Sequence, residues 1–157
     1  MVIRMAEKND ALLEKYINVY MSVFKYIGDL VSEPTKRYKL SFEQFLIMRD
    51  VENSEQVGMS DIAAKRGVTR AAISRQIKVM LDHHYLVQER DPIDRRRLYL
   101  RLTPEGKQVT TKINQAIRKV FEGWVDMLGS DKANDLLSIM EEVGEKIIRK
   151  GQGTPKA

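Results

Sequence analysis

Apolar residues recur at alternating steps of three and four along two long segments, one near each end of the chain. This spacing places them on one face of an α-helix. The first stripe lies within residues 8–31 and consists of Leu13, Ile17, Tyr20, Phe24, Ile27 and Val31. The second follows Pro104 and consists of Val109, Ile113, Ile117, Val120, Trp124 and Met127. We therefore predict two long helices, the first ended by Pro34, because proline lacks the N–H that would continue it.

Residues with capping character mark the starts of further helices. Ser41 and Gln44 form an S-x-x-Q capping box, which predicts the start of the second helix. Gly67 is expected to make the turn between the third and fourth helices, because glycine adopts a positive φ at little cost. The expected N-caps of the third, fourth and fifth helices are Ser60, Thr69 and Thr103. A sixth helix is predicted over residues 132–149, with one apolar face formed by Leu136, Met140, Val143 and Ile147.

A strict alternation of apolar and polar residues replaces the helical period between the fourth and fifth helices. It covers residues 97–102 and predicts a β-strand. A partner strand is expected over residues 86–90, and the turn between them contains Asp91, Pro92 and Asp94. The predicted fold is thus mainly α, with six helices and one small β-hairpin.

The third and fourth helices are predicted to form a helix-turn-helix. Ala63 is small enough to let the two helices approach, Gly67 makes the turn, and Ile73 anchors the second helix. The inward face of that helix is formed by Ile73, Ile77, Met80 and Leu81. The opposite face carries Arg70, Ala71, Ser74, Arg75 and Lys78. Because arginine can donate two hydrogen bonds to guanine in the major groove, this face is a candidate for reading DNA.

The positive charge of the chain is concentrated around these helices. The net charge is +5, and residues 60–101 hold ten basic and five acidic residues, so the rest of the chain is balanced. Such a segment suits a polyanion. A solvated basic face is the alternative explanation of the same count.

Three adjacent arginines, Arg95, Arg96 and Arg97, stand at the bend of the predicted hairpin. Like charges repel each other, so a negative partner would account for their position. Such a tip can enter a minor groove, where narrow A·T tracts concentrate negative potential. Asp94 is expected to pair with one arginine and to hold it in place. The alternative is an exposed charged turn that serves solubility.

The stretch D-P-I-D-R-R-R-L-Y-L-R-L-T-P-E-G, residues 91–106, resembles the wing of the MarR family of winged helix-turn-helix transcription regulators. The order of six helices with a hairpin before the fifth is also similar, over about residues 8–148. The resemblance implies that Asp94 is the buttressing aspartate, that Arg96 enters the minor groove, and that the helix over 70–81 reads DNA. One residue departs from the family pattern: Tyr85 occupies the place where a glycine is expected at the exit of the recognition helix.

These interpretations define the candidate domains and contacts. Residues 1–34 and 104–150 are expected to form a helical dimerisation region, 35–103 a winged helix-turn-helix lobe, and 151–157 a flexible tail. The candidate DNA contacts are Ser60, Thr69, Arg70, Ala71, Ser74, Arg75, Lys78, Asp94, Arg95, Arg96 and Arg97. The long apolar stripes favour a homodimer, although packing within one chain is the alternative.

The function predicted from these features is that of a sequence-specific, dimeric DNA-binding transcription regulator, acting as a repressor on a pseudo-palindromic site in double-stranded DNA. An architectural protein that binds DNA without sequence preference is the other interpretation. Catalysis is not expected, since the two histidines, His83 and His84, are adjacent and diverge on a helix. The chain has no cysteine, so a thiol redox sensor is excluded and neither a metal nor a cofactor is expected. No segment suggests a membrane span or export, and a cytoplasmic location is expected.

A small aromatic or lipophilic effector is implied by the resemblance to the MarR family. The residues that would line its pocket are Tyr16, Tyr20, Tyr26, Met48 and Trp124. Aromatic and methionine residues at helical spacing are also ordinary core residues, which is the alternative.

Overall fold

The computed structural model describes residues 2–149, and the chain divides into two compact units, Met1–Ile117 and Arg118–Ala157. The tail expected over 151–157 lies outside the described residues. Within the described part, α1, η1 and α2 form one helical segment and α7 continues into η2, so the chain has the predicted six helices and one hairpin.

The N-terminal segment consists of α1 (Val2–Val19), a π-helical turn η1 (Tyr20–Phe24) and α2 (Lys25–Lys36). The prediction that Pro34 ends this helix is wrong, because Pro34 lies inside α2, which ends at Lys36. A proline this close to a C-terminus removes a hydrogen bond from the last turn only, so the helix tolerates it. The exit is instead made by Lys39, whose φ is 57°, and Leu40 donates back to the carbonyl of Thr35 at 3.2 Å.

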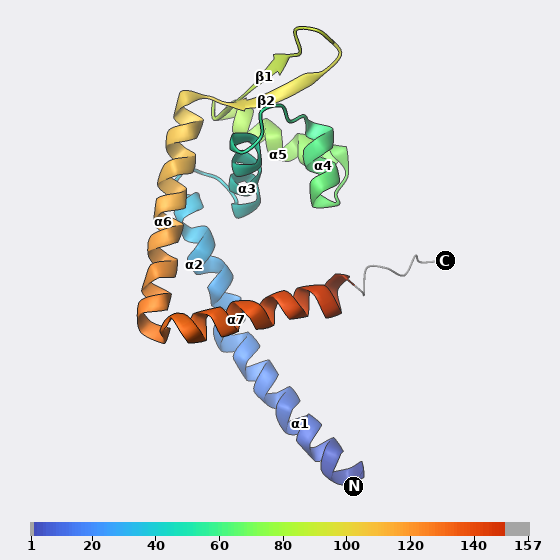
Figure 1. The fold of residues 1–157 in the computed structure, drawn as a ribbon, viewed down its shortest axis with the longest axis vertical. Coiled ribbons are helices and arrows are strands. Elements are labelled where there is room, and N and C mark those ends of the chain that lie inside the picture. The colour runs from blue at the N-terminus through green and yellow to red at the C-terminus, as the bar shows by residue number, and fades with distance from the viewer. Residues whose placement is uncertain (1, 150–157) are drawn as a thin grey trace, which may run out of the picture. The chain divides into compact units, whose positions relative to one another are not determined.

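The same unit contains α3 (Phe42–Glu52), α4 (Met59–Arg66), α5 (Arg70–Asp82), β1 (Leu86–Arg90) and β2 (Leu98–Leu102), as Figure 1 shows. We call these elements, with the start of α6 (Pro104–Leu128), the winged-helix lobe. Its core is formed by Leu40, Phe45, Ile47, Met48, Val51, Val57, Ile62, Ala63, Ile73, Ile77, Met80, Leu86, Leu100, Leu102, Val109 and Ile113. Within the lobe, the apolar periodicity identifies the inward face of α5 and of the start of α6 correctly. The apolar stripes predicted near the two ends of the chain are largely exposed instead, as at Leu13, Ile17, Leu136 and Met140.

Three of the four predicted N-caps are confirmed. The Ser41 hydroxyl accepts from Gln44 N–H at 3.1 Å, and Gln44 Oε1 accepts from Ser41 N–H at 2.8 Å, so the capping box of α3 is complete. Thr69 Oγ1 accepts from Ala72 N–H at 3.2 Å at the start of α5. Thr103 Oγ1 accepts from Gly106 N–H at 2.9 Å at the start of α6.

The fourth predicted cap, Ser60, is wrong, because α4 begins two residues earlier than predicted, at Met59. Gly58 is the N-cap, and its N–H donates to Asp61 Oδ2 at 2.8 Å. Asp61 thus occupies the third helical position, where a carboxylate can reach back to the cap. Val57 pairs with Leu100 of β2. The extended segment therefore ends at Val57, and the helix starts directly after Gly58.

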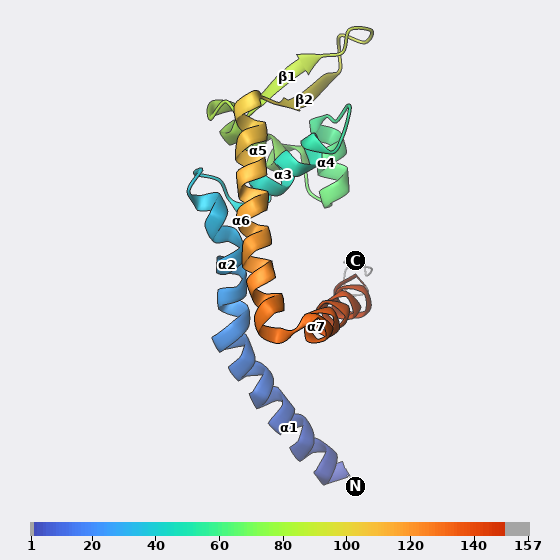
Figure 2. The same ribbon diagram turned by 60° about the vertical axis from the view of Figure 1, so that its left-hand side comes forward.

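The hairpin pairs β1 with β2 in antiparallel register, with Leu86 opposite Leu102 and Arg90 opposite Leu98. Figure 2 shows that the loop joining the two strands projects away from the helices of the lobe, as it also does in Figure 1. Strand β2 begins at Leu98, one residue later than predicted.

The left-handed residue at the exit of α5 is His84, not Tyr85. His84 has a φ of 58°, and Tyr85 N–H donates to the carbonyl of Met80 at 2.9 Å. This hydrogen-bond pattern is a Schellman motif. In this motif the left-handed residue, here His84, immediately precedes the residue whose N–H donates to the carbonyl five positions back, here Tyr85. Tyr85, which stands where the family pattern has glycine, is therefore not the residue that adopts the left-handed conformation. Tyr85 instead packs against the core.

The second unit contains the end of α6 from Arg118, then α7 (Ser130–Val143) and a π-helical turn η2 (Gly144–Arg149). The last helix therefore starts two residues before the predicted Lys132. Gly129, with a φ of 82°, makes the turn between the two helices. No helix within residues 2–149 combines the length and the apolar character needed to cross a bilayer.

Candidate nucleic-acid interface

The helix-turn-helix has the geometry that its sequence predicts. Gly67 has a φ of 62°, and Val68 N–H closes the turn by donating to the carbonyl of Ala63 at 3.1 Å. Ala63 and Ile73 are buried where α4 and α5 meet. All five residues predicted for the outward face of α5 are exposed: Arg70, Ala71, Ser74, Arg75 and Lys78. Lys78 pairs with Asp82 at 2.8 Å, so its charge is partly balanced within the helix.

A concave surface joins the wing to the start of α4 and the start of α5. Its volume is about 380 Å³, and it is lined by Gly58, Met59, Ser60, Asp61, Arg70, Arg96, Arg97, Leu98 and Tyr99. The structure thus brings together Ser60, Arg70, Arg96 and Arg97, which the sequence places on three different elements. Ser60 is exposed at the second position of α4, so its hydroxyl is available at a helix N-terminus, where free N–H groups favour anions.

The turn of the wing is organised by Asp91, a residue that the sequence marked only as part of a turn. Asp91 is buried, and its Oδ1 accepts from Ile93 N–H at 2.7 Å and from Asp94 N–H at 2.8 Å. Its own N–H donates to the carbonyl of Arg97 at 3.0 Å. The hydrogen bonds from Asp94 and Ile93, followed by one with Tyr99, lower the pKa of Asp91. The carboxylate is therefore ionised and fixed, and it locks the backbone of the loop.

Asp94 pairs with an arginine, as predicted, and the arginine is Arg97. Asp94 Oδ2 lies 3.7 Å from Arg97 Nε, while Asp94 Oδ1 accepts the backbone N–H of Arg96 at 3.1 Å. Arg97 also interacts with Tyr99, and this hydrogen bond, with the nearby Asp94, raises the pKa of Arg97. Within the described residues, the guanidinium groups of Arg95 and Arg96 have no hydrogen-bond or ion-pair partner.

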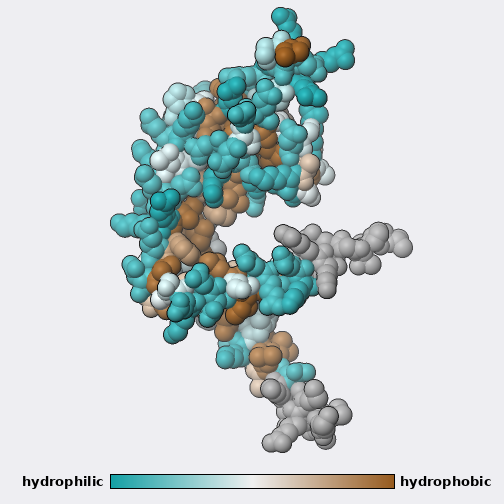
Figure 3. Space-filling model, viewed as in Figure 1, coloured by the Kyte–Doolittle hydropathy of each residue, from teal (hydrophilic) through white to brown (hydrophobic). Residues whose placement is uncertain are grey.

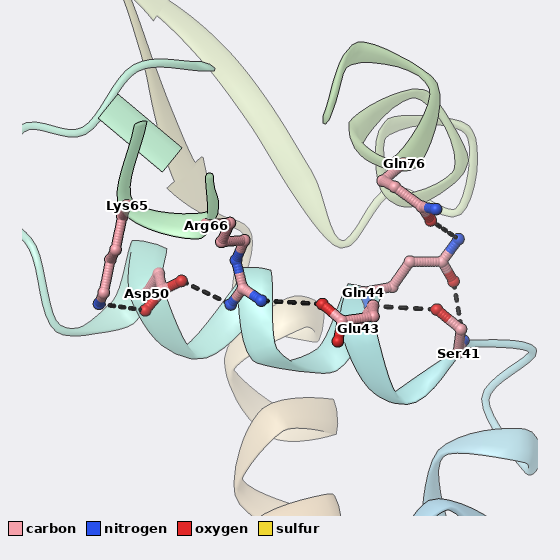
Figure 4. Close-up of polar contacts among 7 residues, drawn as sticks. All are labelled: Ser41, Glu43, Gln44, Asp50, Lys65, Arg66 and Gln76. Carbon is pink, nitrogen blue, oxygen red and sulfur yellow. Dashed lines mark hydrogen bonds and ion pairs between the residues drawn. The ribbon is translucent and has the colours of Figure 1, made fainter. Parts of the chain in front are cut away.

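A polar cluster links side chains of α3 to side chains of α4, as Figure 4 shows. Arg66 Nη2 donates to Asp50 Oδ2 at 2.6 Å and Arg66 Nη1 donates to Glu43 Oε2 at 2.9 Å. Lys65 donates to the other oxygen of Asp50 at 2.6 Å. Burial raises the pKa of Asp50, but the hydrogen bonds from Lys65 and Arg66 outweigh it, and the pKa is lowered overall. The cluster ties the C-terminal end of α4 to α3.

A second link joins α3 directly to the recognition helix. Gln44 Nε2 donates to Gln76 Oε1 at 2.9 Å, while the same amide caps α3 through Ser41. Gln44 is buried, so the bond is protected from water. Sequence reasoning identified Gln44 only as a cap, because the partner is 32 residues away along the chain.

The residues predicted to line an effector pocket lie in different settings. Tyr16, Tyr20 and Tyr26 are exposed on the N-terminal helical segment, and the Tyr16 and Tyr20 ring centroids are 6.4 Å apart. Met48 is completely buried in the core of the winged-helix lobe. Trp124 belongs to the second unit. An open, mostly apolar surface beside Tyr16 is formed by residues of α1 alone: Asn9, Leu12, Leu13, Lys15, Tyr16 and Val19.

This chain is similar in sequence to known transcriptional regulators. The sequence pattern of the family described as transcriptional regulator SarA/Rot matches residues 29–114. The HTH-type transcriptional regulator TcaR of Staphylococcus aureus is 27% identical over 138 residues, which cover 86% of this chain and 88% of TcaR.

Two solved structures share the fold. S. aureus MarR in complex with salicylate and kanamycin has a TM-score of 0.71 at 18% identity, covering 92% of this chain and 97% of that one. The transcriptional repressor CouR, bound to a 23-mer DNA duplex, has a TM-score of 0.66 at 19% identity, covering 86% of this chain and 90% of that one.

The predicted MarR-like winged-helix fold is thus confirmed. The family match runs from α2 through the helix-turn-helix and the wing into α6, and it covers more than half of the chain. The chain therefore belongs to the SarA/Rot family of transcriptional regulators, DNA-binding proteins with the MarR-type winged helix.

Proposed function

We propose that this regulator binds a pseudo-palindromic operator in double-stranded DNA, with α5 in the major groove and the wing in the minor groove. The observation that carries the proposal is the concave surface where Ser60, Arg70, Arg96 and Arg97 converge beside the exposed face of α5. Arg70, Ser74 and Arg75 read bases or contact phosphates, and Thr69 and Ala71 allow close approach at the helix N-terminus. Lys78 and Arg95 contact phosphates, and Arg96 enters the minor groove.

The regulator acts as a homodimer in this proposal. Large apolar side chains on the N-terminal segment are exposed, including Leu12 at 66% and Tyr16 at 58%. Figure 3 shows a mostly hydrophilic surface on the viewed face of the winged-helix lobe and hydrophobic side chains exposed along α1. Among the described residues of the second unit, the large apolar side chains that are exposed are Phe121, Met127, Leu128, Leu136, Leu137, Ile139, Met140 and Val143. A second copy would remove such surface from water.

The domain assignment follows from this arrangement. Residues 1–34 and 104–150 supply the dimerisation helices, and residues 35–103 supply the lobe that meets DNA. A twofold axis then places two α5 helices in successive major grooves, about 34–36 Å apart. The start of α6 also serves the lobe, since Val109 and Ile113 belong to its core.

Repression released by a small aromatic or lipophilic ligand is the regulatory part of the proposal, with action in the cytoplasm. CouR is described as a repressor, and the S. aureus MarR structure holds salicylate, which supports this choice for a chain of the same fold. Of the predicted pocket residues, Tyr16, Tyr20 and Tyr26 of the first unit remain candidates, because Met48 is completely buried in the core of the lobe. The ligand must bind one dimer conformation more tightly than the other to change DNA affinity.

A binding titration tests the proposal. Duplexes selected from random DNA and scrambled duplexes of the same length are titrated at several salt concentrations, and sedimentation gives the oligomeric state. We expect a dimer with a marked preference for the selected duplex and an affinity that falls steeply with salt. Equal affinity for all duplexes would instead favour an architectural DNA-binding protein, which has no use for base-reading side chains on α5. A monomer would contradict the twofold arrangement.

A further inference from the structure

An isoleucine stands fully in water at the tip of the wing. Ile93 is 95% exposed, which is the highest exposure of any large apolar side chain in the part of the chain that the structure describes. It lies between Pro92 and Asp94, immediately before the three arginines. Exposed apolar side chains are common at protein surfaces. What sets this one apart is its position at the end of a basic hairpin that projects from its lobe (Figures 1 and 2).

The backbone that carries Ile93 is held by hydrogen bonds. Asp91 Oδ1 accepts from the N–H of Ile93 at 2.7 Å and from the N–H of Asp94 at 2.8 Å. Pro92 has a fixed φ, and Arg97 N–H closes the loop by donating to the carbonyl of Asp94 at 2.9 Å. A β-branched side chain on such a loop also has few rotamers. Little conformational entropy is therefore lost when Ile93 is buried against a partner.

The chemistry of the surroundings restricts that partner. The guanidinium groups of Arg95 and Arg96, which are unpaired among the described residues, favour an anionic surface. Ile93 favours an apolar surface close to the same place. The minor groove of a duplex offers both, because its deoxyribose walls and stacked bases lie between two rows of phosphates. Proteins that bind this groove insert apolar side chains between base steps and partly unstack them.

We propose that Ile93 is an apolar wedge that enters the minor groove beside Arg96 and partly unstacks one base step. This inference rests on the proposed function of the wing as a minor-groove element. Pyrimidine–purine steps are the most easily unstacked, so Ile93 makes the protein favour a TA or CA/TG step where the wing tip lies. The wing thereby contributes sequence preference through the deformability of DNA, in addition to the attraction between arginine and a narrow groove.

The test compares Ile93→Ser with Val87→Ser, a matched control on β1 of the same hairpin whose side chain is 40% exposed. Operator duplexes carry 2-aminopurine at the step under the wing, and its fluorescence reports unstacking. We expect wild-type protein and Val87→Ser to raise the fluorescence, and Ile93→Ser to leave it flat while weakening binding on the order of tenfold. Ile93→Leu should restore both signals. The slope of affinity against salt should stay the same in Ile93→Ser, because no phosphate contact is lost.

Several outcomes would overturn the wedge and leave the DNA-binding proposal intact. These are an affinity of Ile93→Ser within twofold of wild type, a fluorescence rise that Ile93→Ser retains, or an equal loss in Val87→Ser. A lowered melting temperature of Ile93→Ser would mean that the residue is structural. Vesicles of anionic lipid serve as a second probe, and Ile93-dependent binding to them without any change at the operator would place the side chain at a membrane surface instead. Failure of the wild-type protein to prefer its operator would defeat the proposed function itself.

Discussion

Arg66 donates a hydrogen bond of 2.6 Å to Asp50, and this ion pair joins the end of α4 to α3. Arg66 immediately precedes Gly67, so the pair fixes the point from which the chain turns into α5. Both side chains are largely shielded, with exposed fractions of 17% for Arg66 and 14% for Asp50. The Arg66 Nε is buried and has no hydrogen-bond partner among the described residues, so the ion pair is what stabilises this charge inside the lobe. The direction of the recognition helix thus depends on an ion pair as well as on apolar packing.

The first prediction is that Asp50→Asn destabilises the protein by about 1–3 kcal/mol at neutral pH, because it leaves a buried cation without its counter-charge. The matched control is Glu43→Gln, which removes the other carboxylate that contacts Arg66. Glu43 is 67% exposed, so its loss should cost less than about 1 kcal/mol. Urea unfolding monitored by circular dichroism gives both values. Equal losses in the two variants would contradict the role assigned to Asp50.

The same ion pair should make the stability of the protein depend on pH. The pKa of Asp50 is lowered in the folded protein, because hydrogen bonds from Lys65 and Arg66 outweigh the opposing effect of burial. Its contribution is therefore fully present above the unfolded pKa of about 3.9 and is lost as pH falls through the lowered folded value. The pKa of Asp91 is also lowered in the folded protein, so its contribution to stability is likewise lost as pH falls. We expect the stability of the wild-type protein to fall more steeply below about pH 4 than that of Asp50→Asn. Parallel curves would show that Asp50 does not carry this linkage.

Gly106 supports another prediction, because it packs directly against the backbone carbonyl of Tyr85 and leaves no room for a side chain. Gly106→Ala should destabilise the protein by about 1–3 kcal/mol, since the start of α6 must move away from α5 and β1. Gly123→Ala is the control in the same helix, where an added Cβ meets nothing within 4 Å. That variant should gain up to about 1 kcal/mol from helix propensity. Thermal unfolding of both variants gives the two changes in stability. An unchanged stability of Gly106→Ala would contradict the close approach of Gly106 to Tyr85.

The exit of α5 gives a prediction in which two neighbouring residues behave oppositely. His84 has a φ of 58°, so His84→Gly should stabilise the protein by about 0.5–1 kcal/mol. This value is the strain energy that a side chain has in the left-handed conformation, reduced by the conformational entropy that glycine loses on folding. Tyr85 packs on the core, so Tyr85→Gly should cost about 2 kcal/mol or more. Unfolding free energies of the two variants are the measurement. A stabilising Tyr85→Gly would restore the family's expected glycine to that position.

Much of the lobe could be predicted from sequence, because its determinants are local. The spacing of Ile73, Ile77 and Met80 defines a helical face, and Ser41 and Thr69 cap helices through residues three positions away. One of the errors has a distant cause. The start of α4 depends on Val57 pairing with Leu100 of β2, a contact that no short sequence window contains.

The candidate site shows the same division. The basic face of α5 and the row of arginines are visible in the sequence. The different contacts that the three arginine side chains make are not. The buried Asp91 sets the loop backbone, and this geometry directs Asp94 toward Arg97. The Arg96 side chain is then left without a partner in the part of the chain that the structure describes. The exposure of Ile93 depends on the same turn. A D-P-x-D pattern indicates a turn but not which side chains it presents to solvent.

Arg96→Ala is expected to weaken operator binding about 10- to 100-fold, the effect of losing an arginine inserted into a minor groove, with little change in melting temperature. Its guanidinium has no hydrogen-bond or ion-pair partner within the described residues, so folding does not depend on it. Arg97→Ala provides the comparison, because Arg97 interacts with Asp94 and Tyr99 and should affect the stability of the loop as well. Fluorescence anisotropy with labelled duplexes and differential scanning calorimetry separate the two effects. A large loss of stability in Arg96→Ala would make that residue structural.

Arg75→Ala should relax sequence preference more than it weakens binding. Arg75 lies exposed in the second turn of α5, one turn after the helix N-terminus, and its position on the outward face allows a bidentate contact with guanine. Losing that contact should cost about 1–3 kcal/mol on the operator and little on scrambled DNA. Lys78→Ala is the control, because a phosphate contact should weaken binding to all duplexes alike and reduce the salt slope by about one. Selection of bound fragments from random DNA shows the difference directly: the Arg75→Ala protein should lose preference at one base pair per half-site. An unchanged selected sequence would mean that Arg75 contacts the backbone, and the base-reading role would then fall to Arg70 and Ser74.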